Sequence, residues 1–221
     1  MNNTVKCQSL FAFKSDLFKS ILSDYEYPWD ILPHLKNILY ELIERGIAGY
    51  TLLCDGVLIG SDVNICKSVY IDAPSIIGHG TSLRHGAYLR GGTLIGSGCV
   101  IGNSSEIKNS ILMDHVQVPH YNYVGDSILG EGVHLGAGAI CSNLRSDKGK
   151  VGIKCDKRCI DTGLRKLGAI VGDYAEIGCG AVLCPGTVIG KCTTVYPLTL
   201  ARGVYPHDSL VKQDNTVIQR Q

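Results

Sequence analysis

An aliphatic residue stands at every sixth position of this chain from position 53 to position 107, without a break. These positions are Leu53, Ile59, Ile65, Ile71, Ile77, Leu83, Leu89, Ile95, Ile101 and Ile107. Neither the 3.6-residue period of a helix nor the two-residue alternation of a strand produces this spacing. A fixed internal period is typical of a solenoid in which each repeat forms one short strand and one turn. We therefore predict an all-β fold, a parallel β-helix with the aliphatic residues pointing inward.

A small or β-branched residue follows four positions after most of these aliphatic residues. The first members of this second series are Val57, Val63, Val69, Ser75, Thr81 and Ala87. We expect these side chains to fit at the corners of the coil. Equivalent residues of successive coils should then stack about 4.8 Å apart in parallel ladders.

The period is interrupted twice. Between Met113 and Leu129 the spacing is sixteen residues, which predicts a slip or bulge in the coil. From about 144 to 168 the pattern vanishes and charged residues dominate, which predicts a loop inserted into the coil; the period resumes at Val171. Interruptions of a regular scaffold are common places for function.

Residues 1–50 have a different pattern, with apolar residues at helical spacing between Asp30 and Arg45 and Gly46 as a possible C-terminal cap. A shorter helix is expected from Asp16 to Leu22. We predict that residues 1–50 form a helical segment that caps the open first coil, and that 51–221 form the β-helix domain.

The composition excludes several classes of partner. The net charge is +1, so no overall field attracts nucleic acid or an anionic membrane. No apolar run approaches the ~20 residues that span a bilayer, and the N-terminus lacks the layout of a signal peptide. The ten cysteines are then expected to be reduced thiols in the cytoplasm.

Two motifs follow within or just after the first interruption: Pro-His-Tyr-Asn-Tyr-Val-Gly-Asp at 119–126 and Leu-Gly-Ala-Gly at 135–138. In these motifs the sequence resembles the acetyltransferase domain of the bifunctional N-acetylglucosamine-1-phosphate uridyltransferase and glucosamine-1-phosphate acetyltransferase. The likeness extends over residues 89–143 and more weakly over 170–190. It implies a left-handed coil, a homotrimer with active sites between subunits, and acetyl-coenzyme A as co-substrate.

His120 is the candidate catalytic base. Acetyl transfer to an amine requires removal of a proton during attack on the thioester, and an imidazole with a pKa near ~6.5 suits that task. The resemblance places the family's catalytic histidine on His120. It also implies that Glu106 orients or charges this histidine.

Arg90 and Lys108 are candidate substrate-binding residues. They are separated by eighteen positions, or one coil, so they should stack on adjacent rungs. Two cations so placed repel by about 3 kcal/mol at an effective dielectric near 20, unless an anion lies between them. The resemblance places sugar-phosphate ligands on these positions.

The resemblance implies five further site residues. Tyr123, His134 and Lys166 match substrate-binding positions, although the family has an asparagine where His134 stands. Ala137 and Asn143 match cofactor-binding positions, and the backbone amide of Ala137 would receive the developing oxyanion. The first fifty residues are too short for a uridyltransferase domain, so only acyl transfer is expected.

The sequence thus predicts an acetyl-coenzyme A-dependent N-acetyltransferase of an amino-sugar phosphate, with glucosamine 1-phosphate as the favoured acceptor. Its product would enter the synthesis of UDP-N-acetylglucosamine. Two alternatives remain open. The spacing of His79, His115 and His120 resembles that of the zinc ligands of gamma-class carbonic anhydrases, and a non-catalytic trimer could bind a sugar nucleotide.

Overall fold

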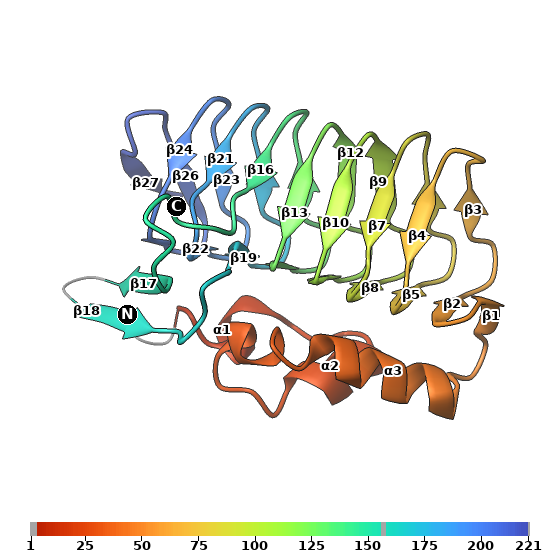
Figure 1. Cartoon of the computed structure of the whole chain (residues 1–221). Coiled ribbons are helices and arrows are strands. Elements are labelled where there is room, and N and C mark those ends of the chain that lie inside the picture. The colour runs from red at the N-terminus through yellow and green to blue at the C-terminus, as the bar shows by residue number, and fades with distance from the viewer. Residues whose placement is uncertain (1–3, 156–157, 221) are drawn as a thin grey trace.

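The chain is a parallel β-helix of about eight coils with three flat sides, which a computed structural model describes for residues 4–155 and 158–220 (Figure 1). Each side is one sheet, named here A, B and C. In spatial order, sheet A contains β1 (Thr51–Cys54), β2 (Val57–Ile59), β5 (Ser75–Ile77), β8 (Thr93–Ile95), β11 (Ser110–Leu112), β14 (Ile128–Leu129), β19 (Ala169–Val171), β22 (Thr187–Ile189) and β25 (Val204–Tyr205).

The strands of sheets B and C are also given in spatial order. Sheet B contains β27 (Val217–Gln219), β26 (Ser209–Val211), β23 (Thr194–Val195), β20 (Glu176–Ile177), β15 (His134–Leu135), β12 (Gln117–His120), β9 (Val100–Asn103), β6 (Ser82–Leu83) and β3 (Asn64–Ile65). Sheet C contains β4 (Tyr70–Asp72), β7 (Tyr88–Arg90), β10 (Glu106–Lys108), β13 (Tyr123–Gly125), β16 (Ile140–Cys141), β21 (Val182–Leu183) and β24 (Leu200–Ala201).

The inside of the coil is filled by the aliphatic residues of the six-residue period. Those from Leu83 to Ile107 are buried in one continuous cluster with the small corner residues Ala87 and Cys99. Strands of successive coils pair in parallel, with Ile77 opposite Ile95 eighteen positions later. The predicted fold class is therefore confirmed.

The predicted slip is real, but it has a different form from the expected bulge between Met113 and Leu129. The step between inward residues falls from six to five twice, from Ile107 to Leu112 and from Val124 to Leu129. Met113 consequently packs outside the coil. Two corners between sheets C and A are each one residue short, and left-handed residues, Asn109 (φ 47°) and Asp126 (φ 48°), occupy them.

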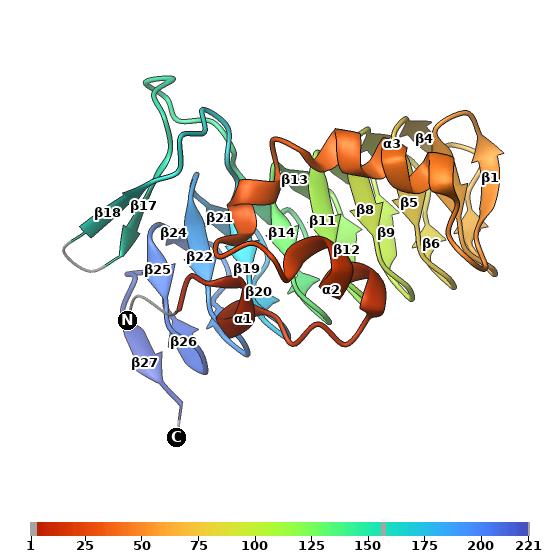
Figure 2. The same ribbon diagram turned by 90° about the horizontal axis from the view of Figure 1, so that it is seen from below.

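The N-terminal helices do not cap the first coil as predicted. They are α1 (Cys7–Leu10), α2 (Asp16–Leu22), the 3₁₀ helix η1 (Pro28–Ile31) and α3 (Leu35–Arg45). These elements lie along the outer side of sheet A (Figure 2). The reason is that sheet A has a second, outward row of aliphatic side chains, which the helices bury together with Val151, Ile153 and Leu167 of the inserted segment: Leu58, Ile76, Leu94, Ile111, Ile128, Ile170 and Val188.

Among the described residues, no helix combines the length and the apolar character needed to span a bilayer.

The second interruption is an excursion from the coil, as expected. Ile128 and Ile170, which pair on adjacent strands of sheet A, are separated by 42 residues, whereas Ile77 and Ile95 are separated by 18. The excursion carries a hairpin of β17 (Gly152–Cys155) and β18 (Arg158–Asp161). Val151 is buried against the solenoid, where a Cβ added to Gly186 would lie 2.7 Å from its Cγ1. The excursion therefore forms a wall beside the last coils.

Thiol reactivity should follow this architecture. Burial raises the pKa of the Cys99 and Cys141 thiols to about 12, whereas Cys54 and Cys159 are exposed. Because the thiolate is the reactive form, iodoacetamide at pH 8 is expected to alkylate Cys54, Cys159 and the likewise exposed Cys179 first. Cys99 and Cys141 should react only after unfolding, which timed labelling followed by peptide mass spectrometry would measure. Early alkylation of Cys141 would contradict the buried position.

Candidate active site

Sheet C presents two rows of outward-facing residues that run along the solenoid axis. The first row is Tyr70, Tyr88, Glu106, Tyr123 and Ile140, and the second is Asp72, Arg90, Lys108, Gly125 and Ser142. Arg90 and Lys108 thus occupy adjacent rungs, as their spacing predicts. Three of the predicted substrate-binding residues, Arg90, Lys108 and Tyr123, lie together on this face.

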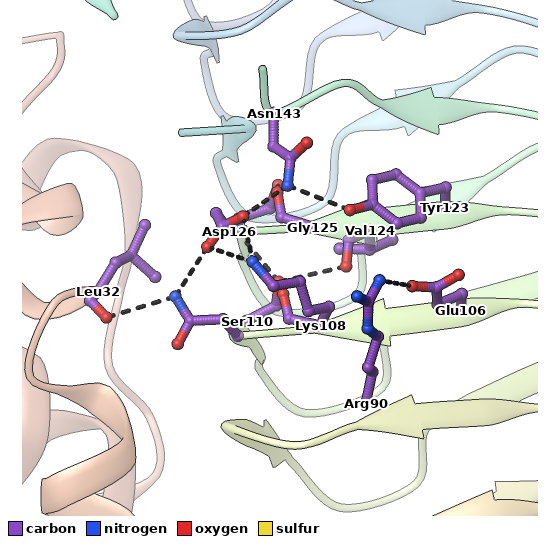
Figure 3. A network of polar contacts seen from close by, with 12 residues as sticks. Leu32, Arg90, Glu106, Lys108, Ser110, Tyr123, Val124, Gly125, Asp126 and Asn143 are labelled. Atoms are coloured by element: carbon purple, nitrogen blue, oxygen red, sulfur yellow. Dashed lines mark hydrogen bonds and ion pairs between the residues drawn. The ribbon is translucent and has the colours of Figure 1, made fainter. Parts of the chain in front are cut away.

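Asp126 is the centre of a polar network at the shortened corner beside this face (Figure 3). Its carboxylate accepts hydrogen bonds from Lys108 Nζ at 2.9 and 3.1 Å and from Asn109 Nδ2 at 2.9 Å. It also accepts one from Asn143 Nδ2 at 2.5 Å, and that amide donates to Tyr123 Oη at 3.1 Å. One buried carboxylate therefore fixes three side chains around the sheet C face.

Tyr123 is held as a neutral hydrogen-bond donor. Burial, and then the carboxylates of Asp126 and Glu106, raise the pKa of its phenol. Because Asn143 donates to the phenol oxygen, the phenol proton remains for another acceptor. Such a donor suits a sugar hydroxyl.

Arg90 and Lys108 do not form the mutually repelling pair that the sequence predicted, in which only a bound anion would offset the repulsion. Arg90 Nη1 donates to Glu106 Oε1 at 3.0 Å, and Lys108 pairs with Asp126, so each cation already has a carboxylate partner. Glu106 accordingly points to Arg90, and it forms no hydrogen bond or ion pair with the His120 ring among the described residues. Arg90 is exposed and uses one of its five N–H donors in this pair, so the others remain for a ligand.

His120 ends strand β12 at the corner between sheets B and C, and it is exposed. Its N–H donates to Asn122 Oδ1 at 2.9 Å, and its carbonyl accepts from Gly138 N at 2.9 Å. The buried Asn122 amide also donates to the carbonyls of Gly136 and Ala139, at 2.8 and 3.1 Å. One side chain therefore ties the backbone of His120 to the turn that carries the predicted oxyanion donor.

Ala137 lies at the tip of that turn, one coil beyond His120. It is exposed, and its N–H makes no backbone hydrogen bond within the described part of the chain. A Cβ built on the neighbouring Gly138 would meet nothing within 4 Å, so the space beside this turn is open. An unpaired amide next to an exposed imidazole fits the requirements of an acyl-transfer site.

The remaining two predicted substrate residues lie outside sheet C. His134 projects from sheet B, where its Nδ1 lies 2.9 Å from Glu176 Oε2. Lys166 is exposed at the root of the excursion and forms a bridge with Leu144. The next residue, Leu167, donates its N–H to the carbonyl of Asn143 at 3.0 Å, so Lys166 lies beside the Asp126 network.

The three histidines of the zinc alternative do not meet within one chain. His79 and His115 lie at the corner between sheets A and B, whereas His120 lies between sheets B and C. His79 Nδ1 accepts a hydrogen bond from Ser61 N at 2.8 Å, and its ring packs against Tyr50. Over residues 4–155 and 158–220, no three His, Cys, Asp or Glu side chains are arranged to hold a metal ion.

Sequence reasoning missed Asp126, Asn109 and Asn122. The two shortened steps in the inward series mark the first two positions, since Asn and Asp tolerate the left-handed backbone of a tight corner. No sequence pattern marks Asn122, because its role depends on the backbone carbonyls of the next coil, to which its amide donates.

Comparisons with known proteins relate this chain to part of several longer ones. A family model described as the GMPPB C-terminal domain matches residues 71–155. The bifunctional protein GlmU of Methanococcus vannielii is 32% identical over 208 residues, which cover 90% of this chain and 49% of that protein. A bifunctional sugar-1-phosphate nucleotidylyltransferase/acetyltransferase of Sulfurisphaera tokodaii is 39% identical over 90 residues, or 41% of this chain and 22% of the relative. The chain therefore spans at most about half of these relatives.

Among solved structures, the UDP-N-acetylglucosamine acyltransferase from Campylobacter jejuni aligns with a TM-score of 0.50. The alignment covers 76% of this chain and 71% of that one, at 16% sequence identity. At this identity the likeness concerns the fold.

Proposed function

We propose that this chain, a hexapeptide-repeat β-helix protein related to the C-terminal acetyltransferase region of the bifunctional GlmU proteins, is an acetyl-coenzyme A-dependent N-acetyltransferase. Its acceptor is an amino-sugar phosphate, with glucosamine 1-phosphate favoured. The observation that carries the proposal is the corner where Asn122 ties His120 to the turn of Ala137. A base and an oxyanion donor are the two groups that this reaction needs.

The proposed roles follow from these positions. The ammonium of the acceptor first loses one proton to solvent, and His120 removes the second proton from the nitrogen as it attacks the thioester carbonyl. The Ala137 amide stabilises the negative charge that develops on the carbonyl oxygen. Acetyl-coenzyme A supplies the acetyl group as a thioester with a good leaving group. The proton held by His120 can then pass to the departing thiolate, which balances the reaction.

The sheet C face supports a phosphorylated sugar as the acceptor. Arg90 keeps free guanidinium donors on the same face as the Tyr123 hydroxyl, two rungs before the strand that follows His120. Lys108 adds a second positive charge one rung away, although Asp126 holds it in place. Lys166 at the root of the excursion would supply a third.

We include a homotrimer with sites between subunits in this proposal. The helices cover the outer side of sheet A, so a second copy can reach only sheets B and C. His120, Ala137, Arg90, Lys108 and Tyr123 lie on those two sheets and at the corner between them. A partner surface placed there would exclude water from the open space beside Gly138.

Thiol release from acetyl-coenzyme A tests the proposal directly. Purified protein is expected to release thiol with glucosamine 1-phosphate and to form N-acetylglucosamine 1-phosphate in equal amount, measured by mass spectrometry. Glucosamine without phosphate should react more slowly, because it lacks the group that Arg90 binds. Glucosamine 6-phosphate and galactosamine 1-phosphate test the sugar. If no amino sugar stimulates thiol release above background, the proposed activity is wrong.

A further inference from the structure

A cavity of about 330 Å³ lies between the excursion and the last coils of sheet C, beyond the site described above. The excursion contributes residues 144–147, 151, 152 and 154. The solenoid contributes Ser142, Val182, the turn 184–186, Arg202 and Gly203. Its volume is at the lower end of the range of about 300–1,000 Å³ for ligand pockets, and is larger than a lone phosphate needs.

The charge of this cavity is positive. Arg145 is paired with Asp147, whose carboxylate also accepts the Gly149 N–H at 3.0 Å, so this pair shapes the excursion. Lys154 and Arg202 have no ion pair with a carboxylate of the described residues. Both residues line the cavity, Lys154 from the excursion and Arg202 from the solenoid.

The cavity also has an apolar wall and free hydroxyl groups. Leu144 and Val182 supply apolar surface, and no hydrogen bond involves the Ser142 or Ser146 hydroxyl within residues 4–155 and 158–220. Cations and hydroxyls bind phosphate oxygens, whereas the apolar wall suits a planar base. A nucleotide combines both chemistries.

The floor of the cavity continues the outward row that holds Arg90 and Lys108. Beyond Gly125 the row runs through Ser142 and Cys184 to Arg202. The small side chains at 125, 142 and 184 leave room above the sheet, and the Tyr123–Asn143 hydrogen bond separates the two regions. At about 4.8 Å per rung, the cavity lies within roughly 5–15 Å of the His120 coil along the axis.

We infer that this cavity binds a nucleotide, with its phosphates on Lys154 and Arg202 and its base against the apolar wall formed by the excursion. The nucleotide can be the adenosine end of coenzyme A or the nucleoside diphosphate of a nucleotide-linked sugar. The inference rests on the cavity alone and does not require the proposed acetyl transfer.

Isothermal titration calorimetry with 3′,5′-adenosine diphosphate and uridine diphosphate tests this inference. One of the two is expected to bind the wild-type protein. Lys154→Met and Arg202→Met should each weaken that binding about fivefold to tenfold, the value of one charge-assisted contact. Lys150→Met is the matched control, because Lys150 is an exposed cation of the same excursion outside the cavity.

The outcomes distinguish coenzyme A from a nucleotide-linked sugar, and they test the nucleotide cavity separately from the proposed acetyl transfer. Selective loss of adenosine diphosphate binding in the variants identifies coenzyme A, and selective loss of uridine diphosphate binding identifies a nucleotide sugar. Binding that is equal in all four proteins, absent, or matched by inorganic phosphate overturns the inference. Nucleotide binding without amine-dependent thiol release would support the nucleotide site and reject the proposed acetyl transfer.

Discussion

The His120→Ala variant is expected to lose amine-dependent thiol release by roughly 10²–10⁴-fold, the usual contribution of a positioned acid–base group. The exposed ring of His120 lies beside the open space at Gly138, where it can reach an acceptor amine. The phosphate-binding residues are untouched, so kcat should fall while KM for glucosamine 1-phosphate changes little. Steady-state thiol release at several acceptor concentrations measures both constants.

His85→Ala is the matched control for this variant. His85 is also exposed and lies at the same corner two coils earlier, where its Nδ1 contacts Ser68 Oγ at 2.7 Å. Its loss should leave thiol release nearly unchanged. A His120→Ala enzyme that retains the wild-type rate would mean that another group removes the proton.

The Ile128→Ala variant should lose about 2–5 kcal/mol of unfolding free energy. Ile128 points outward from sheet A, yet it is fully buried under the N-terminal helices. The eleven residues of α3 are too few for a stable isolated helix, so the helical layer depends on contacts of this kind. Urea denaturation followed by circular dichroism measures the change.

Ile140→Ala provides the comparison on the uncovered side. Ile140 also points outward, but from sheet C, where it is 37% exposed. Its truncation should change the unfolding free energy by about 0.5 kcal/mol or less, as is usual for surface positions. Equal losses in both variants would contradict the assignment of the helices to sheet A alone.

The motif at 119–126 was sufficient to predict the relationship to the GlmU proteins, which the sequence matches confirm. The motif could not predict the partners of its charged residues. Glu106 was expected beside His120, but it pairs with Arg90 on the neighbouring strand. Partners in a solenoid come from adjacent coils, so they depend on coil length as well as on the motif.

The length of one coil decided the position of Asp126. Asp126 follows Lys108 by eighteen residues, so an uninterrupted coil would stack the two on adjacent rungs. Because the coil is one residue shorter, Lys108 instead stacks on Gly125, and Asp126 turns into the corner with a left-handed backbone. There it reaches Lys108, Asn109 and Asn143 together.

The six-residue period by itself determined the inside of this protein, because a coil that narrow admits only aliphatic and small side chains at its inward positions. It did not determine what covers the outside, since the three sides of a coil are locally alike. A hint exists in adjacent aliphatic pairs such as Leu58–Ile59, Ile76–Ile77 and Leu94–Ile95, which recur every eighteen residues. Only the tertiary structure showed that the helices bury this side, and that sheet C therefore remains open for the candidate site and the cavity beside it.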